Sequence, residues 1–162
     1  NLLIDYPTEG KILSSPIFIN VENVPYIIFS SADHLIHFID IEGNPYPGWP
    51  ITVERNINGS VAVSDLNADG EPELALTNKL GEILVFHLDG SQYHHFPIDN
   101  GFPFTGPPLI IDIDADNDME IIIGSAQNLS VIDLKQNIST IQDDINTLNN
   151  KVFPPAEEDE NK

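Results

Sequence analysis

The chain has 162 residues, with 26 Asp and Glu against 6 Lys and Arg, and its formal net charge of −20 disfavours nucleic acids and anionic membrane surfaces as partners. Cysteine is absent, which excludes disulfides, thiolate metal sites and cysteine nucleophiles. The 41% apolar content allows an ordinary globular core, but no run reaches the roughly 18 apolar residues of a membrane span, so membrane insertion is not expected.

Three segments that contain an aromatic-Pro pair recur along the chain. NLLIDYPT, NPYPGWPI and SQYHHFPI align without gaps, and their pairs Tyr6-Pro7, Trp49-Pro50 and Phe96-Pro97 follow each other at steps of 43 and 47 residues. Within a repeat, four short runs of β-branched and aromatic residues are separated by turn sequences; in the second repeat these runs are 61–66, 73–78, 82–88 and the stretch that ends at Phe96. This period predicts an all-β fold of consecutive four-stranded β-propeller blades. A three-sheet β-sandwich with chance repeats is the alternative.

The first part of the chain lacks the acidic loop found later. Residues 1–7 align with the end of a repeat, so we expect them to be the last strand of a preceding blade. Blade one is expected over 13–51. Its segment INVENVPYIIF keeps Asn20 and Glu22 but is shorter and has no carboxylates at the fifth and ninth positions, so we expect no metal there.

Blades two and three, expected over 60–98 and 108–134, each carry an acidic loop. The loops are DLNADGEPE and DIDADNDME, offset by 47 residues, and an apolar strand follows each. Oxygen-bearing side chains at positions 1, 3, 5 and 9 converge when the backbone turns tightly at position 6, which is Gly70 or Asn117. Calcium prefers such oxygen ligands. The candidate ligands, with a backbone carbonyl at position 7, are Asp65, Asn67, Asp69, Glu71 and Glu73 in blade two and Asp112, Asp114, Asp116, Asp118 and Glu120 in blade three. The alternative is that these acidic residues only solvate a hairpin turn.

The loops are not EF-hands. An EF-hand needs an acidic residue at position 12, where this chain has Leu76 and Ile123, and strands rather than helices are expected to flank the loops. The segments VAVSDLNADGEPELAL and LIIDIDADNDMEIII resemble the FG-GAP, or VCBS-type, repeats of the integrin α-subunit propeller and of many bacterial secreted proteins. The resemblance covers blades two and three. It implies an extracellular or cell-surface protein whose calcium-stiffened blades present loops to a protein or glycan partner for adhesion. The lack of cysteine favours a bacterial secreted protein over an integrin.

The sequence contains no recognisable catalytic motif. A nucleophile elbow, a phosphate-binding loop and a paired catalytic-acid motif are all missing, so we expect a binding protein and not an enzyme. Two alternatives stay open. The blades could belong to a larger secreted polysaccharide-acting enzyme whose catalytic residues lie elsewhere, or to an assembly subunit that pairs through its open ends.

Histidine pairs are weaker candidates for a metal site. His34 and His37, and separately His94 and His95, lie close in sequence. Neighbouring side chains of a strand point to opposite faces, so His94 and His95 are not expected to share an ion. All four are expected to be structural or surface residues.

The aromatic residues near the repeated proline have two interpretations. Tyr46, Trp49 and Tyr93 could stack on sugars, as in propeller lectins, or could wedge between adjacent blades. Because the aromatic-Pro position recurs, we expect the wedge.

The pattern changes to helical spacing after Leu134. Residues 137–152 predict an amphipathic helix with one apolar stripe, formed by Ile138, Ile141, Ile145, Leu148 and Val152. We expect this helix to pack on blade three, with a coiled coil as the alternative. Residues 153–162 predict a disordered acidic tail.

Three blades are too few to close a propeller. Closed propellers use about 4 to 8 blades, so we expect partners that complete the ring. These are either further blades of a longer parent chain, of which a chain starting at Asn1 would be a mature or excised piece, or other copies of this chain.

Overall fold

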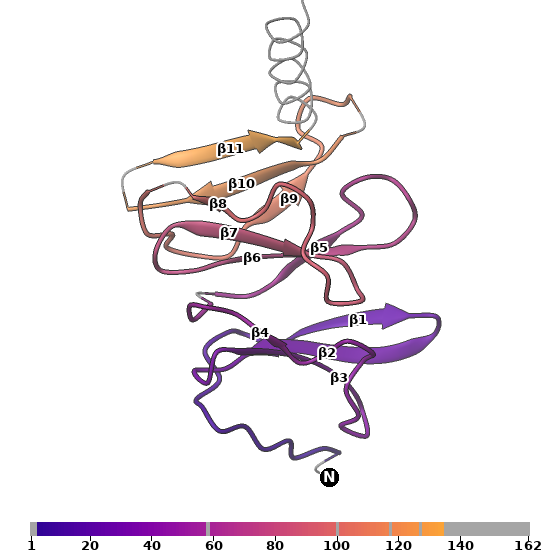
Figure 1. Ribbon diagram of the computed structural model, residues 1–162. Coiled ribbons are helices and arrows are strands. Elements are labelled where there is room, and N and C mark those ends of the chain that lie inside the picture. Colours follow the sequence, from indigo (N-terminus) through magenta and orange to yellow (C-terminus); the bar gives the residue numbers. More distant parts are fainter. Residues whose placement is uncertain (1–2, 58, 100, 117, 127, 135–162) are drawn as a thin grey trace, which may run out of the picture.

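Three antiparallel sheets stacked one on the next make up the fold (Figure 1). The computed structural model describes residues 3–57, 59–99, 101–116, 118–126 and 128–134, and the predicted helix and acidic tail lie outside these ranges. Among the described residues, no helix is long and apolar enough to span a membrane.

Each sheet corresponds to one predicted blade. Blade one has the strand order β1 (Ile17–Val21), β2 (Val24–Ser30), β3 (Leu35–Asp40) and β4 (Ile51–Thr52). Blade two has the order β5 (Ala62–Ser64), β6 (Glu73–Thr77), β7 (Glu82–Phe86) and β8 (Ile98–Asp99). Blade three has three described strands, β9 (Leu109–Ile111), β10 (Glu120–Gly124) and β11 (Leu129–Asp133), in the order β11-β10-β9. The all-β prediction is confirmed, and the predicted four-stranded sheets are confirmed for blades one and two.

The fourth strand of a blade follows the aromatic-Pro pair, whereas the sequence predicted a strand that ends at Phe96. That prediction is wrong. His94 and His95 lie in a turn, and His95 has a left-handed φ of 67°. Since Pro97 has no N–H to donate, ladder pairing begins only after it, where Ile98 pairs with Ile83. Blade one behaves in the same way, with β4 directly after Trp49-Pro50.

Residues 3–8, most of the segment predicted as the last strand of a preceding blade, form no strand. A strand needs a partner, and no described segment pairs with these residues. Tyr6 still packs on blade one, with its ring centroid 5.9 Å from that of Phe29 and 5.6 Å from that of His37.

The core lies between the blades. One cluster includes Ile28, Ile36 and Phe38 of blade one with Leu74, Leu76 and Phe86 of blade two. The other includes Ala75, Ile83 and Val85 of blade two with Ile121 and Ile123 of blade three. Strand alternation explains this arrangement, because successive residues of β6 point to opposite faces and both faces are covered.

Trp49 fills the junction between blades one and two. Its side chain is 6% exposed, its ring lies edge-on to Phe38 at 5.4 Å, and its Nε1–H donates a 2.7 Å hydrogen bond to the carbonyl of Leu88. The wedge expected for this position is confirmed. Phe96 contacts the second cluster from the corresponding place in blade two.

Candidate metal-binding loops

The two acidic loops occupy the same place in neighbouring blades. Asp65 follows β5 directly and Glu73 begins β6, while Asp112 follows β9 and Glu120 begins β10. In blade one the matching connection is only a two-residue turn, in which Glu22 and Asn23 have φ values of 52° and 67°. The two later blades therefore have room for a side-chain cage that blade one does not have.

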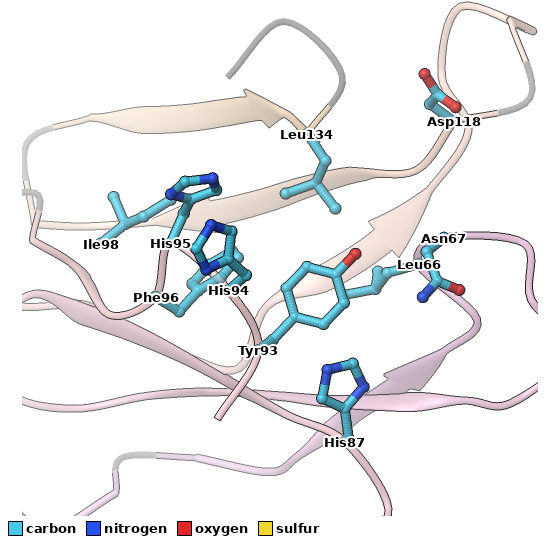
Figure 2. Close-up of a pocket in the computed structure, with 10 residues that line it drawn as sticks. All are labelled: Leu66, Asn67, His87, Tyr93, His94, His95, Phe96, Ile98, Asp118 and Leu134. Atoms are coloured by element: carbon cyan, nitrogen blue, oxygen red, sulfur yellow. The ribbon is translucent and has the colours of Figure 1, made fainter. Parts of the chain in front are cut away.

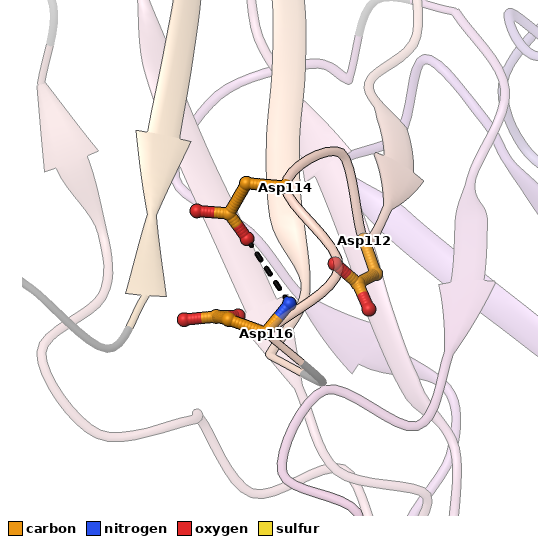
Figure 3. Close-up of side chains that lie close together, drawn as sticks. All are labelled: Asp112, Asp114 and Asp116. Carbon is orange, nitrogen blue, oxygen red and sulfur yellow. Dashed lines mark hydrogen bonds between the residues drawn. The ribbon is translucent and has the colours of Figure 1, made fainter.

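The loop of blade three brings three carboxylates together. Asp112, Asp114 and Asp116 each place one carboxylate oxygen within 4.8 Å of the others (Figure 3). Backbone N–H groups orient them: Ala115 donates to Asp112 Oδ1 at 2.7 Å, Asp116 to Asp114 Oδ1 at 3.3 Å and Asp118 to Asp116 Oδ1 at 3.0 Å. Three clustered carboxylates on a short loop are a donor set that fits Ca²⁺.

The loop of blade two has the same construction with one amide. Asp65 accepts hydrogen bonds from the N–H groups of Asp69 and Gly70 at 3.1 and 2.8 Å, and Asn67 Oδ1 accepts one from Asp69 N at 3.0 Å. Asp69 in turn accepts from the N–H of Glu71, and this bond, followed by one from the Asn67 side chain, lowers the pKa of Asp69. The carboxylate stays ionised, as cation binding requires.

The loops turn at two places, and the sequence predicted one of them. Gly70 at position 6 has the expected left-handed φ, at 93°, whereas Asn117 lies outside the described residues. Position 4 is also left-handed in both loops, with φ values of 58° at Ala68 and 64° at Ala115. Alanine rarely adopts this conformation, so composition gave no signal for it.

Glu73 and Glu120, predicted as ligands at position 9, are buried beneath the loops with 1% and 3% exposure. Each accepts a backbone hydrogen bond across its own loop, Glu73 Oε2 from Leu66 N at 2.8 Å and Glu120 Oε2 from Ile113 N at 2.7 Å. Desolvation raises the pKa of Glu73, while the bond from Leu66 opposes the shift. Both glutamates thus fasten the start of the loop to its end.

His87 is a site residue that sequence reasoning missed. Its Nδ1 lies 3.3 Å from Glu73 Oε1, so both oxygens of Glu73 have partners inside the protein. The sequence did offer one signal for this contact. His87 directly follows β7, and that end of β7 lies beside the start of β6, where Glu73 is. His37, in contrast, is buried with Nε2 3.0 Å from Ser31 Oγ, in keeping with a structural histidine.

A pocket of about 570 Å³ adjoins both loops (Figure 2). Asn67 comes from the loop of blade two and Asp118 from that of blade three, and the remaining wall is mostly aromatic, histidine and aliphatic: Leu66, His87, Tyr93, His94, His95, Phe96, Ile98 and Leu134. The centroids of the Tyr93 and His87 rings are 4.9 Å apart, and burial raises the pKa of Tyr93.

His94 and His95 lie together at this pocket, contrary to expectation. Their ring centroids are 3.7 Å apart, because they occupy a turn and not a strand. The rule that neighbouring strand residues face opposite ways does not apply to them.

Comparison with known proteins adds information on the fold. No protein-family model matches the chain, and no curated protein matches it. Among solved structures, BamB from Moraxella catarrhalis is similar, with a TM-score of 0.55 and 14% sequence identity. The match covers 79% of this chain but only 35% of the length of BamB. The computationally designed Ika4 protein matches 82% of this chain and 98% of its own, with 12% identity and a TM-score of 0.40. The likeness to BamB, together with the stacked four-stranded sheets, shows that this chain has an all-β, propeller-like fold.

Proposed function

We propose that the chain is a calcium-stabilised propeller module of the FG-GAP or VCBS type that binds a protein or glycan outside the cell. The observation that carries the proposal is the cluster of Asp112, Asp114 and Asp116. Three carboxylates held this close repel one another, and a divalent cation between them would replace repulsion with attraction. The same loop recurs in blade two, which supports a metal site over a chance cluster of acidic surface residues.

Bound calcium would stabilise the fold and would take no part in a reaction. Each loop joins the first two described strands of its blade, so a bound ion would fix the loop against the sheet and stiffen the rim beside the pocket. The side chains available to hold it are those of Asp65, Asn67 and Asp69 in blade two and of Asp112, Asp114 and Asp116 in blade three. The backbone carbonyls of Glu71 and Asp118, at position 7 of each loop, are the further ligands that we propose. Glu73 and Glu120 would support them from below through the bonds to Leu66 and Ile113.

The pocket beside the loops is the candidate ligand site. Tyr93 and Phe96 supply aromatic surface on which the apolar face of a sugar ring could stack, and Asn67 and the histidines supply hydrogen-bonding groups. A mostly apolar wall with a few polar groups is typical of small-ligand sites. We therefore favour a glycan as the ligand of this pocket.

Calorimetric titration of the chelator-treated protein with CaCl₂ is expected to give two binding events, with dissociation constants of about 10⁻⁴–10⁻³ M or tighter. The loop of blade three should bind more tightly, because its clustered side chains are three carboxylates where the loop of blade two offers two and an amide. Asp116→Ala should weaken the tighter event about tenfold or more, Asp69→Ala the weaker one, and the exposed Glu54→Ala neither. The melting temperature should rise with calcium concentration. Absence of heat at millimolar calcium would contradict the proposal.

Tyr93→Ala is expected to reduce glycan binding about tenfold or more, because it removes the ring from the pocket wall, whereas Tyr93→Phe should keep most of it. A glycan array followed by titration of the best ligand measures this. Phe18→Ala, a change at an exposed aromatic of blade one, is the matched control. Turnover of a polysaccharide by this chain, lost on substitution of one of its own residues, would instead establish an enzyme.

A further inference from the structure

Blade three has an open edge within the described part of the chain. In blades one and two a fourth strand pairs with the third, through Ile36 and Ile51 and through Ile83 and Ile98. In blade three, β11 pairs with β10, and no described strand pairs with its other edge. An open edge presents unpaired backbone groups to any strand that can dock there.

The outer face of blade three carries exposed apolar side chains, and no described segment lies over them. Leu109 and Ile111 of β9 and Leu129 and Val131 of β11 are all exposed, Leu129 to 71% and Val131 to 51%. Strand pairing shows which residue of blade two matches Leu129. Leu129 pairs with Gly124, the last residue of β10, and Ile83 pairs with Thr77, the last residue of β6, so Ile83 is the matching residue. Ile83 and Val85 are fully buried against blade three. The exposed face is thus the face by which a blade normally contacts the next one.

The N-terminal segment is the complementary part. Tyr6-Pro7-Thr8 aligns with Trp49-Pro50-Ile51, and Tyr6 rests on Phe29 and His37 of blade one. Phe29 and His37 form a cross-strand pair that corresponds to the Leu76 and Leu84 pair of blade two. Leu76 and Leu84 belong to the cluster that contains Trp49. Tyr6 therefore sits against blade one as Trp49 sits against blade two, and among the described residues no sheet precedes it.

We propose that two copies of the chain associate head to tail, with Thr8 and Glu9 of each copy, which follow its aromatic-Pro pair, adding as the fourth strand of blade three of the other. The pairs Ile36 with Ile51 and Ile83 with Ile98 set the register, which places Thr8 opposite Leu129 of the second copy. Trp49 contacts Phe38 of blade one. Val131 is the residue of blade three that corresponds to Phe38, so Tyr6 of the second copy would cover Val131. Two such junctions make a six-bladed ring, within the range that closed propellers use. This inference does not depend on calcium or on the ligand.

Sedimentation velocity and light scattering of the full chain, at about 1–100 μM and about 0.15 M salt, test the association. The salt limits repulsion between copies that each carry a net charge of −20. We expect a dimer whose dissociation constant rises about tenfold or more in Leu129→Asp, since a buried charge would face the partner's segment. Leu80→Asp, a change at an exposed leucine of a blade-two turn, should have no effect, and both variants should keep the circular dichroism spectrum of the parent.

Disulfide trapping tests the register. Because the chain has no cysteine, Thr8→Cys and Leu129→Cys can be introduced into separate copies and mixed. We expect a crosslinked dimer from this mixture, and little when Thr52→Cys, on the completed edge of blade one, replaces Thr8→Cys. A parent chain that stays monomeric at about 100 μM overturns the proposal, as does crosslinking no greater than the control. A chain that dimerises only when cut after Leu134 would show that its own last residues cover the face, and would also overturn it.

Discussion

Trp49→Ala is expected to lower the free energy of unfolding by about 3–5 kcal/mol, the range for removing a large buried aromatic side chain. Trp49 fills the junction between blades one and two, where it packs edge-on against Phe38. The substitution leaves a void there and also removes the donor to the carbonyl of Leu88. Urea denaturation followed by circular dichroism measures the loss.

Trp49→Phe is the matched control for this prediction. It keeps a ring in the junction but removes the indole N–H, so we expect a smaller loss of about 1–3 kcal/mol. If Trp49→Ala changed the free energy of unfolding by less than about 1 kcal/mol, the junction would not be a principal source of stability.

Glu73→Ala is expected to lower the free energy of unfolding by about 2–4 kcal/mol in calcium-free buffer. The change leaves the N–H of Leu66 without the carboxylate it donates to, which costs about 1–3 kcal/mol for a buried group, and it leaves a cavity as well. Thermal and urea unfolding both measure this.

Glu73→Gln separates hydrogen bonding from charge. The glutamine carbonyl can still accept the bond from Leu66, and a neutral side chain avoids the desolvation that raises the pKa of Glu73. We expect its stability to lie within about 1 kcal/mol of the parent. Equal losses in the two variants would contradict the loop-fastening role of this residue.

The blades could be predicted from the sequence because a repeat leaves several independent signals in register. The apolar runs, the turn sequences and the aromatic-Pro pairs all recur together, and each marks a different part of one sheet. The short fourth strands were misplaced because only two residues pair in each, and the proline before them gives the same signal as the end of a strand.

The candidate site could be predicted only in part. Alternating oxygens in DIDADNDME predicted the cluster of Asp112, Asp114 and Asp116, because loop spacing alone brings those positions together. The buried bonds of Glu73 and the contact with His87 join residues on different strands, and spacing within the loop carries no information about them. The pocket escaped prediction for the same reason, since blades two and three both contribute to its wall.

The burial of β6 determines the order in which the sheets are expected to unfold. All five residues of this strand, Glu73–Thr77, are buried, because blades cover both faces of its sheet and strands flank both its edges. Within a single copy, blades one and three each have only one neighbouring sheet among the described residues, so partial unfolding of the dissociated chain should begin at the ends of the stack and reach β6 last. Amide hydrogens should accordingly exchange with solvent in a gradient along the stack, with the slowest rates in the strand that begins at the base of an acidic loop. Transient opening of an end blade would then leave the middle of the protein, and the end of that loop, intact.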